Sequence, residues 1–293
     1  MQPSLREQFH QIHIQAHRTQ LPGRSLKGVK NTIAIGSGKG GVGKSTLAVN
    51  LAVSLARLGA RVGILDADIY GPSIPTMLGE IKPVDVIDGR YLPIMAHGIQ
   101  AMSIGYLTDE TNDTLIWRGP MLAKALIQML DITAWDDLDY LFIDLPPGTG
   151  DIQLSLVQKI PLSGAIVVTT PQQVATNDAH KALTMFEKTN IPLLGIIENM
   201  SCHVCEACGH TAALFGEGGA AILANQHHTT HLGTLPLHQE IRQHADIGDP
   251  IALHTHPVAT EISQLALNVA LSLNAQPLNY ADRFPPIVVE DKL

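Results

Sequence analysis

The stretch GSGKGGVGKSTL, residues 36–47, decides the fold of this chain. Its glycines and its second lysine meet the spacing G-x-x-x-x-G-K-[ST], with an apolar run before it and a helix-length segment after it. In such a loop the backbone N–H groups point at phosphate oxygens, the lysine adds a positive charge and the hydroxyl reaches Mg²⁺. The expected nucleotide contacts are Gly38, Lys39, Gly40, Gly41, Val42, Gly43, Lys44, Ser45 and Thr46.

Further apolar runs alternate with helix-length amphipathic segments along the chain. These runs are NTIAIGS at 31–37, RVGILDAD at 61–68, YLFIDLPPG at 140–148, GAIVVTTP at 164–171, PLLGIIENM at 192–200 and THLGTLPL at 230–237. Short apolar strands separated by helices predict an α/β fold, a mostly parallel sheet with helices on both faces. Residues 71–138 interrupt the alternation and are expected to add short edge strands and one helix.

Three segments describe the domain organisation. Residues 1–30 form a polar lead-in, 31–275 one P-loop ATPase domain with a cysteine loop at 200–210, and 276–293 a loose, proline-broken tail. The net charge of −8 disfavours nucleic acid as a partner. No run approaches the roughly 18 apolar residues of a membrane span, so we expect no membrane partner and a cytoplasmic location.

The three cysteines of the chain are clustered within seven residues, at Cys202, Cys205 and Cys208. The spacing C-x-x-C-x-x-C suits a metal centre, and two readings stay open. With His203 or His210 the thiolates could complete a tetrahedral zinc site inside one chain. Alternatively, one C-x-x-C pair from each of two chains related by a two-fold axis would supply the four thiolates of a four-iron cluster.

The loop sequence KGGVGKST resembles the deviant Walker A loop of the MinD, ParA and nitrogenase iron-protein class of ATPases. The resemblance implies that Lys39 reaches across a nucleotide-sandwich dimer to the phosphates held by the other chain. It also implies that Asp68, in LDADIYGPS, positions the attacking water or the metal shell, and that Asp144, in FIDLPPGTGD, holds Mg²⁺ through water. Asn199 lies where this class hydrogen-bonds adenine, although a turn-forming asparagine is the alternative.

Further segments narrow the resemblance to the Mrp/ApbC family of iron–sulfur cluster carrier ATPases. They are DADIYGPSIPTMLG, GIQAMSIGYL, WRGPM, DYLFIDLPPGTGD and ENMS followed by C-x-x-C-G. The family implies an ATP-hydrolysing homodimer that binds a labile 4Fe–4S cluster between its subunits, with Cys205 and Cys208 matching the family's cysteine pair. We expect slow hydrolysis in the absence of a target. It implies as partners cluster assembly scaffolds and apo iron–sulfur acceptor proteins. Cys202 is additional to the family pair and is a further candidate ligand.

Two other functions fit parts of the sequence. A zinc-stabilised P-loop ATPase in metal delivery or regulation would use the same cysteines. A MinD- or ParA-like positioning ATPase would need a basic face or a basic amphipathic terminal helix, neither of which is apparent. The histidine-rich stretch NQHHTTH at 225–231 adjoins no carboxylate or cysteine in the sequence, so we expect a surface loop there, with His227 and His228 as weak metal candidates.

Overall fold

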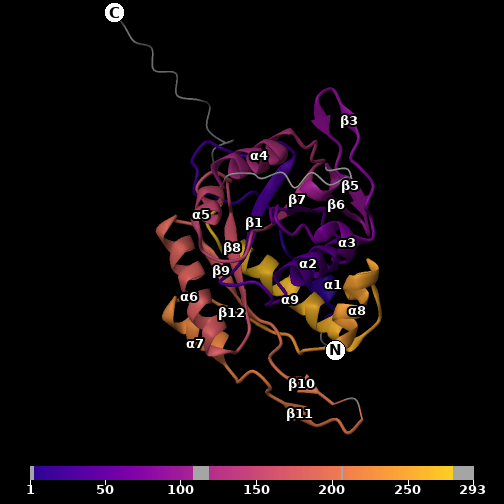
Figure 1. Cartoon of the computed structure of the whole chain (residues 1–293), viewed down its shortest axis with the longest axis vertical. Coiled ribbons are helices and arrows are strands. Elements are labelled where there is room, and N and C mark those ends of the chain that lie inside the picture. Colours follow the sequence, from indigo (N-terminus) through magenta and orange to yellow (C-terminus); the bar gives the residue numbers. More distant parts are fainter. Residues whose placement is uncertain (1–2, 108–118, 206, 280–293) are drawn as a thin grey trace, which may run out of the picture.

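The computed structural model of the chain describes residues 3–107, 119–205 and 207–279. An eight-stranded sheet forms its centre, in the order β12-β9-β8-β1-β7-β2-β6-β5 (Figure 1). The strands are β1 (Val29–Ser37), β2 (Val62–Asp66), β5 (Ile94–Ala96), β6 (Ile99–Ser103), β7 (Leu138–Asp144), β8 (Gly164–Thr169), β9 (Leu193–Glu198) and β12 (His231–Thr234). Neighbouring strands are parallel except for β5, which runs antiparallel to β6 at one edge. The predicted mostly parallel sheet is therefore confirmed.

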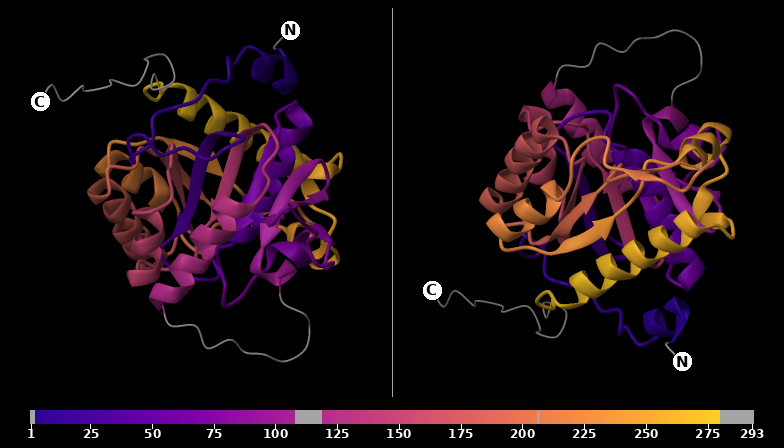
Figure 2. Two further views of the ribbon diagram at one scale, coloured as in Figure 1. Left: turned by 90° about the horizontal axis from the view of Figure 1, so that it is seen from above. Right: turned by 90° about the horizontal axis from the view of Figure 1, so that it is seen from below.

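Helices cover both faces of the sheet, as Figure 2 shows. The described helices are α1 (Leu5–His10), α2 (Lys44–Leu58), α3 (Ile74–Leu78), α4 (Gly119–Ile132), α5 (Asp151–Val157), α6 (Gln173–Lys188), α7 (Gly219–Gln226), α8 (Gln239–Ile247) and α9 (Pro257–Asn274). Two small hairpins, β3 (Val86–Ile87) with β4 (Arg90–Tyr91) and β10 (His203–Val204) with β11 (Thr211–Ala212), lie outside the sheet.

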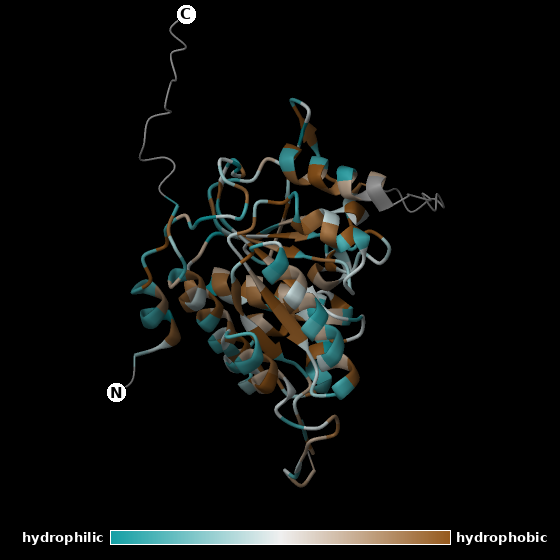
Figure 3. Ribbon diagram, turned by 90° about the vertical axis from the view of Figure 1, so that its left-hand side faces the viewer, coloured by the Kyte–Doolittle hydropathy of each residue, from teal (hydrophilic) through white to brown (hydrophobic). Residues whose placement is uncertain are grey.

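The side chains of β1 alternate between the two faces of the sheet, and this alternation explains why the protein has two hydrophobic cores, one on each face. On β1, Ile33 and Ile35 belong to the core shared with α2 and α9, whereas Ala34 belongs to the core shared with α4, α6 and α7. A strand buried on both faces reads as a continuous apolar run, because successive side chains point to opposite sides. Figure 3 shows these hydrophobic strands between helices whose outer surfaces are hydrophilic. No helix in the described part of the chain is long and apolar enough to cross a membrane.

The segment 71–138 differs from the prediction in two respects. It contains a second helix, α3, which is only five residues long and therefore too short to give a periodic signal. Its strand β6 is not at the edge but pairs in parallel with β2 inside the sheet. Of the motif WRGPM, residues 117 and 118 lie outside the described residues, and α4 begins at Gly119.

The two ends of the described chain are packed on the sheet domain. Phe9 of α1 is only 3% exposed and joins the core. The imidazole of His17 is buried and lies 3.0 Å from Oδ1 of Asn31 on β1. The backbone N–H of Arg18 donates to the carbonyl of Pro277, so the start of the C-terminal tail pairs with the lead-in. Residues 280–293 of the predicted tail lie outside the described residues.

Candidate nucleotide site

The predicted phosphate-binding loop connects β1 to α2 at the carboxyl end of the sheet. Two of its glycines are required by their neighbours. A Cβ on Gly38 would lie 2.1 Å from the backbone carbon of Asp178, because the loop runs directly against α6. Gly43 has φ +82°, and a Cβ there would lie 2.3 Å from Nδ2 of Asn199. The loop is therefore shaped by α6 and by the end of β9 as well as by its own sequence.

Lys44 and Asp144 form a buried ion pair beneath the loop. Nζ of Lys44, which is 6% exposed, lies 2.5 Å from Oδ1 of Asp144 and 3.3 Å from Oγ of Ser45. Asp144 ends β7, in register with Ile35 on β1, and is fully buried. Its other oxygen, Oδ2, is buried without a hydrogen-bond partner in the described part of the chain. The Asp144 carboxylate and the Ser45 hydroxyl, which both contact Lys44, are oxygen donors of the kind that suits Mg²⁺.

Asp66 is a second acidic group at this sheet edge, on β2 in register with Asp144. It is fully buried and accepts hydrogen bonds from the backbone N–H groups of Asp68 and Ile74 and from the hydroxyl of Ser103, at 3.1–3.2 Å. Burial, followed by the charge of Asp144, raises the pKa of Asp66 to about 7. Asp66 therefore faces the protein, where it orders the loop after β2 and the start of α3.

The raised pKa of Asp66 makes stability depend on pH. The folded protein keeps this proton up to about pH 7, whereas the unfolded chain releases it near the ordinary value of 3.8. Because the folded state binds more protons between these values, the contribution of Asp66 to the free energy of unfolding is largest below pH 3.8 and falls as the pH rises through about 7. The loss is on the order of 4 kcal/mol.

Urea unfolding at pH 5 and pH 8, without nucleotide or magnesium, tests this prediction. The parent should lose more stability between the two pH values than the Asp66→Asn variant, which has no titrating group at this position. Equal losses in both proteins would contradict the assignment.

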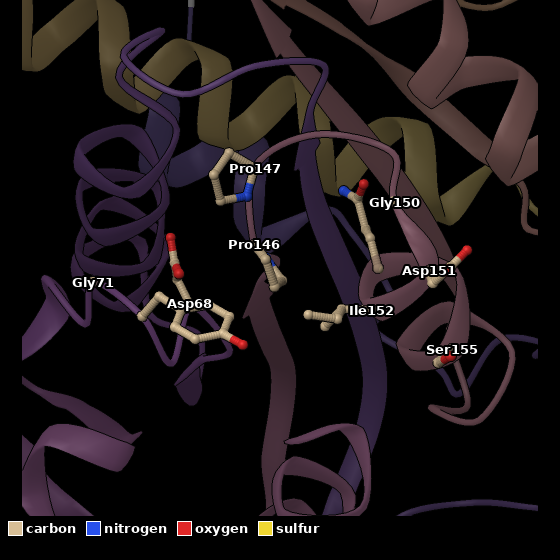
Figure 4. Close-up of a pocket in the computed structure, with 10 residues that line it drawn as sticks. Asp68, Gly71, Pro146, Pro147, Gly150, Asp151, Ile152 and Ser155 are labelled. Carbon is tan, nitrogen blue, oxygen red and sulfur yellow. The ribbon is translucent and has the colours of Figure 1, made fainter. Parts of the chain in front are cut away.

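Asp68 lies in the loop that follows β2, two residues after Asp66, and is partly exposed. Burial raises its pKa, and the nearby charge of Lys44 opposes this effect. The carboxylate lines a cavity of about 210 Å³ together with the phosphate-binding loop and Pro147. It also lines a neighbouring hollow of about 850 Å³, where Figure 4 shows it opposite Pro146 and Pro147. The loops after β2 and β7 thus face each other across the space beside the phosphate-binding loop.

Lys39 is the other lysine of the phosphate-binding loop, and unlike Lys44 it is not paired with Asp144. Its Nζ lies 3.4 Å from Oε1 of Gln172, the N-cap residue of α6, and its backbone carbonyl accepts from the hydroxyl of Ser37. Gln172 was not among the site residues predicted from the sequence. The rule that found Asp68 and Asp144, polar residues after a strand at the carboxyl edge of the sheet, would have found it in TTPQQ.

Asn199 follows β9 and contacts the phosphate-binding loop. Its Nδ2 donates to the carbonyl of Val42 at 2.8 Å, and its side chain lines a small pocket with Thr46, Leu47 and Asn50. This contact orients the side chain beside the loop. Adenine recognition by Asn199 stays a prediction.

The cysteine loop includes the hairpin β10–β11, which projects from the body of the molecule in Figure 1. Cys202 and Cys205 are partly exposed and Cys208 is exposed. A tight turn holds Cys205, whose N–H donates to His210 and whose carbonyl accepts from Gly209. Among the described residues, which exclude residue 206, no group of three metal-ligating atoms within 4.8 Å of one another contains a cysteine. The closed zinc site considered from the sequence is therefore not assembled within this part of the chain.

Most of the histidine-rich stretch 225–231 is exposed, including His228, but His227 is an exception. Residues 219–226 form α7, and the side chain of His227 is only 6% exposed. Its Nδ1 lies 2.8 Å from Oε1 of Glu187, and its Nε2 lies 2.8 Å from Nδ1 of His180, both on α6. The carboxylate that is missing near His227 in the sequence is thus supplied by another helix.

The sheet order, the phosphate-binding loop and the carboxylates at the strand ends define a P-loop NTPase. A family model described as "ParA: NUBPL iron-transfer P-loop NTPase" matches residues 28–270. The chain belongs to this family of iron-transfer P-loop NTPases.

Curated relatives carry the name iron–sulfur cluster carrier protein. One from Escherichia coli strain K12 is 59% identical over 230 residues, which are 78% of this chain and 62% of that protein. The chain thus spans less than two thirds of the length of this relative. One from Pseudomonas fragi is 54% identical over 255 residues, which are 85% of this chain and 88% of that protein.

Solved structures agree with the fold. A nucleotide-binding protein from Archaeoglobus fulgidus in complex with ADP is 36% identical with a TM-score of 0.68, covering 85% of this chain and 94% of that one. The cell division ATPase MinD of Pyrococcus furiosus, at 21% identity, has a TM-score of 0.62 and covers 82% of this chain and 98% of its own. The second likeness concerns the fold alone.

Proposed function

We propose that this chain is an ATP-dependent carrier that binds a 4Fe–4S cluster between two identical subunits and transfers it to apo iron–sulfur proteins. The names of its relatives and of its family support a role in iron–sulfur cluster delivery. The cluster would come from assembly scaffolds. The carrier would act in the cytoplasm, where a cysteine pair stays reduced and able to ligate iron.

The observation that carries this proposal is the connection between the phosphate-binding loop and the cysteines. Asn199 bonds the loop through Val42, and Cys202 follows only three residues later. The stem of the cysteine loop is held to the segment after β12, because the N–H of Ser201 donates to Leu235 and the carbonyl of Cys202 accepts from Leu237. A rearrangement of the phosphate-binding loop on nucleotide binding therefore has a short, hydrogen-bonded route to the cysteines.

Nucleotide binding would exchange the partners of the buried ion pair. In the structure Lys44 neutralises Asp144. The phosphates of ATP would offer Lys44 an alternative anion, while Mg²⁺, held by Ser45 and through water by Asp144, would compensate the carboxylate. Mg²⁺ supplies charge neutralisation at the β- and γ-phosphates, and Asp68 would orient the attacking water. Lys39 would contact the phosphates held by the other subunit, so hydrolysis would depend on dimerisation.

The cysteine pair gives the most direct test of cluster binding. After anaerobic reconstitution with iron and sulfide, the parent should show thiolate-to-iron absorption and about two iron atoms per chain, half of a four-iron cluster. The Cys205→Ser and Cys208→Ser variants should lose this absorption, because a serine hydroxyl is a poor ligand for iron in such clusters.

Cys202→Ser is the matched control, since it removes a thiol from the same loop but leaves the pair intact. Equal iron in all four proteins would overturn the assignment of the ligands. A parent that binds one zinc ion per chain and takes up no iron would support the zinc-stabilised ATPase instead.

A further inference from the structure

A cluster of two histidines and an aspartate lies at the end of α8 and in the segment that follows it. His244 is in the last turn of α8, Asp249 follows its C-cap, and His254 follows the short turn Ile251–Leu253. Nε2 of His254 lies 2.8 Å from Oδ2 of Asp249, and the two imidazole centroids are 4.4 Å apart. One ligand atom from each side chain lies within 4.8 Å of the other two. The side chains of His244 and Asp249 are partly exposed and that of His254 is exposed, so an ion from solution can reach them.

The hydrogen bonds of His244 show which of its nitrogens is free to bind a metal. Its Nδ1 lies 2.8 Å from the backbone carbonyl oxygen of Asp249 and 3.5 Å from Oδ2 of the same residue. A carbonyl only accepts hydrogen bonds, so Nδ1 carries the proton and Nε2 of the neutral ring keeps its lone pair. Metal-ligating histidines usually donate one ring N–H in this way and bind the ion through the other nitrogen. Because Nδ1 is the nitrogen beside the carboxylate, the ring of His244 must turn to bring Nε2 onto an ion shared with Asp249 and His254.

His254 and Asp249 are already close enough to share an ion. Bonds from Zn²⁺ to imidazole nitrogen and to carboxylate oxygen are each about 2 Å long. Two atoms that lie 2.8 Å apart therefore need to separate only slightly to bind the same ion. The ion would replace the proton that now lies between Nε2 and the carboxylate.

In a second cluster with similar composition, both imidazoles already use their lone pair to cap a helix. His238, Glu240 and His256 also bring three ligand atoms within 4.8 Å. However, Nδ1 of His238 accepts from the N–H of Glu240, and Nδ1 of His256 accepts from the N–H of Val258, which caps α8 and α9. Because a neutral imidazole has one lone pair, Nε2 of each ring is protonated and can bind a metal only if a helix cap is lost. This cluster therefore serves the helix ends.

We propose that His244, Asp249 and His254 bind one divalent first-row transition ion, such as Zn²⁺, Co²⁺ or Ni²⁺, with water as the remaining ligand. Two imidazoles and one carboxylate select such ions over Mg²⁺ and Ca²⁺, which prefer oxygen ligands. None of the three ligands is a cysteine of the proposed cluster site.

The location of the site links it to α3. Gly248, next to Asp249, lies against Gly79 at the end of α3, where a Cβ on Gly248 would be 2.3 Å from Cα of Gly79. Nε2 of His97 lies 3.1 Å from the carbonyls of both Leu78 and Gly248. An ion at the site thus holds the turn on which the end of α3 rests.

Calorimetric titration of the full chain with ZnCl₂ tests the proposal. Cys202, Cys205 and Cys208 are first replaced by serine, so that thiolates contribute no zinc binding. This parent should bind one Zn²⁺ per chain. Its His244→Ala and His254→Ala derivatives should bind it at least about tenfold more weakly, since even an outer partner of a metal ligand is worth 10–100-fold in affinity. Zn²⁺ should raise the melting temperature of the parent but not of these derivatives.

His256→Asn is the matched control, because it removes a histidine from the neighbouring cluster while asparagine can still cap α9. It should bind Zn²⁺ as the parent does. Circular dichroism of each metal-free variant checks that its fold is intact. The proposal is overturned if the cysteine-free parent binds no Zn²⁺, if the His244 and His254 variants bind it as tightly as the parent, or if the control loses it equally.

Discussion

Replacing Lys44 with alanine should lower the free energy of unfolding by about 3–5 kcal/mol, even without nucleotide. The cause is the carboxylate of Asp144, which is fully buried and has Lys44 as its ion-pair partner 2.5 Å away. Removal of the ammonium group leaves a buried charge without compensation, and this costs far more than the loss of an exposed ion pair. Urea denaturation of the nucleotide-free protein measures the effect.

Two further variants separate this cause from a general defect of the loop. Lys44→Ala combined with Asp144→Asn should recover most of the lost stability, because no unpaired charge remains. Lys39→Ala changes the other lysine of the same loop and should alter stability by no more than about 0.5 kcal/mol. If Lys44→Ala unfolds at the same urea concentration as the parent, the ion pair does not hold the loop.

The second large effect concerns Lys39 and hydrolysis. Lys39→Ala should reduce ATP turnover by roughly 10³-fold, the lower limit observed for a cation supplied to a transferring phosphoryl group. The free energy of unfolding should be almost unchanged, because Lys39 is partly exposed. In the part of the chain that the structure describes, its side chain donates one hydrogen bond, to the amide oxygen of Gln172. Steady-state phosphate release measures the turnover.

A mixture of two inactive variants shows whether Lys39 acts on its own nucleotide or on that of the partner. In a mixed dimer of Lys39→Ala and Asp68→Asn chains, the site of the first chain keeps Asp68 and receives Lys39 from the second. Half of the dimers are mixed and each has one complete site, so turnover should recover to about a quarter of the parent value. If mixing restores no activity, Lys39 acts within its own chain and the sandwich arrangement is wrong.

Local sequence signals predicted much of the fold and of the candidate site. The apolar runs that end in Asp66 and Asp144 form neighbouring strands, and the parallel register places both carboxylates at the same edge as the loop. These strands and the carboxylates at their ends are predicted from the spacing of residues that are close in the sequence. The short helix α3 was missed because five residues give no periodicity.

The sequence by itself determined the class of protein, since the spacing of glycine, lysine and serine between a strand and a helix specifies a phosphate-binding loop. Only the tertiary structure decided the state of the charged groups. Lys44 pairs with Asp144 across 100 residues, burial raises the pKa of Asp66 to about 7, and His244 meets His254 around the end of α8. The physical reason is that ion pairing, desolvation and ligand geometry depend on distance in space, which the folding of the sheet and its helices sets.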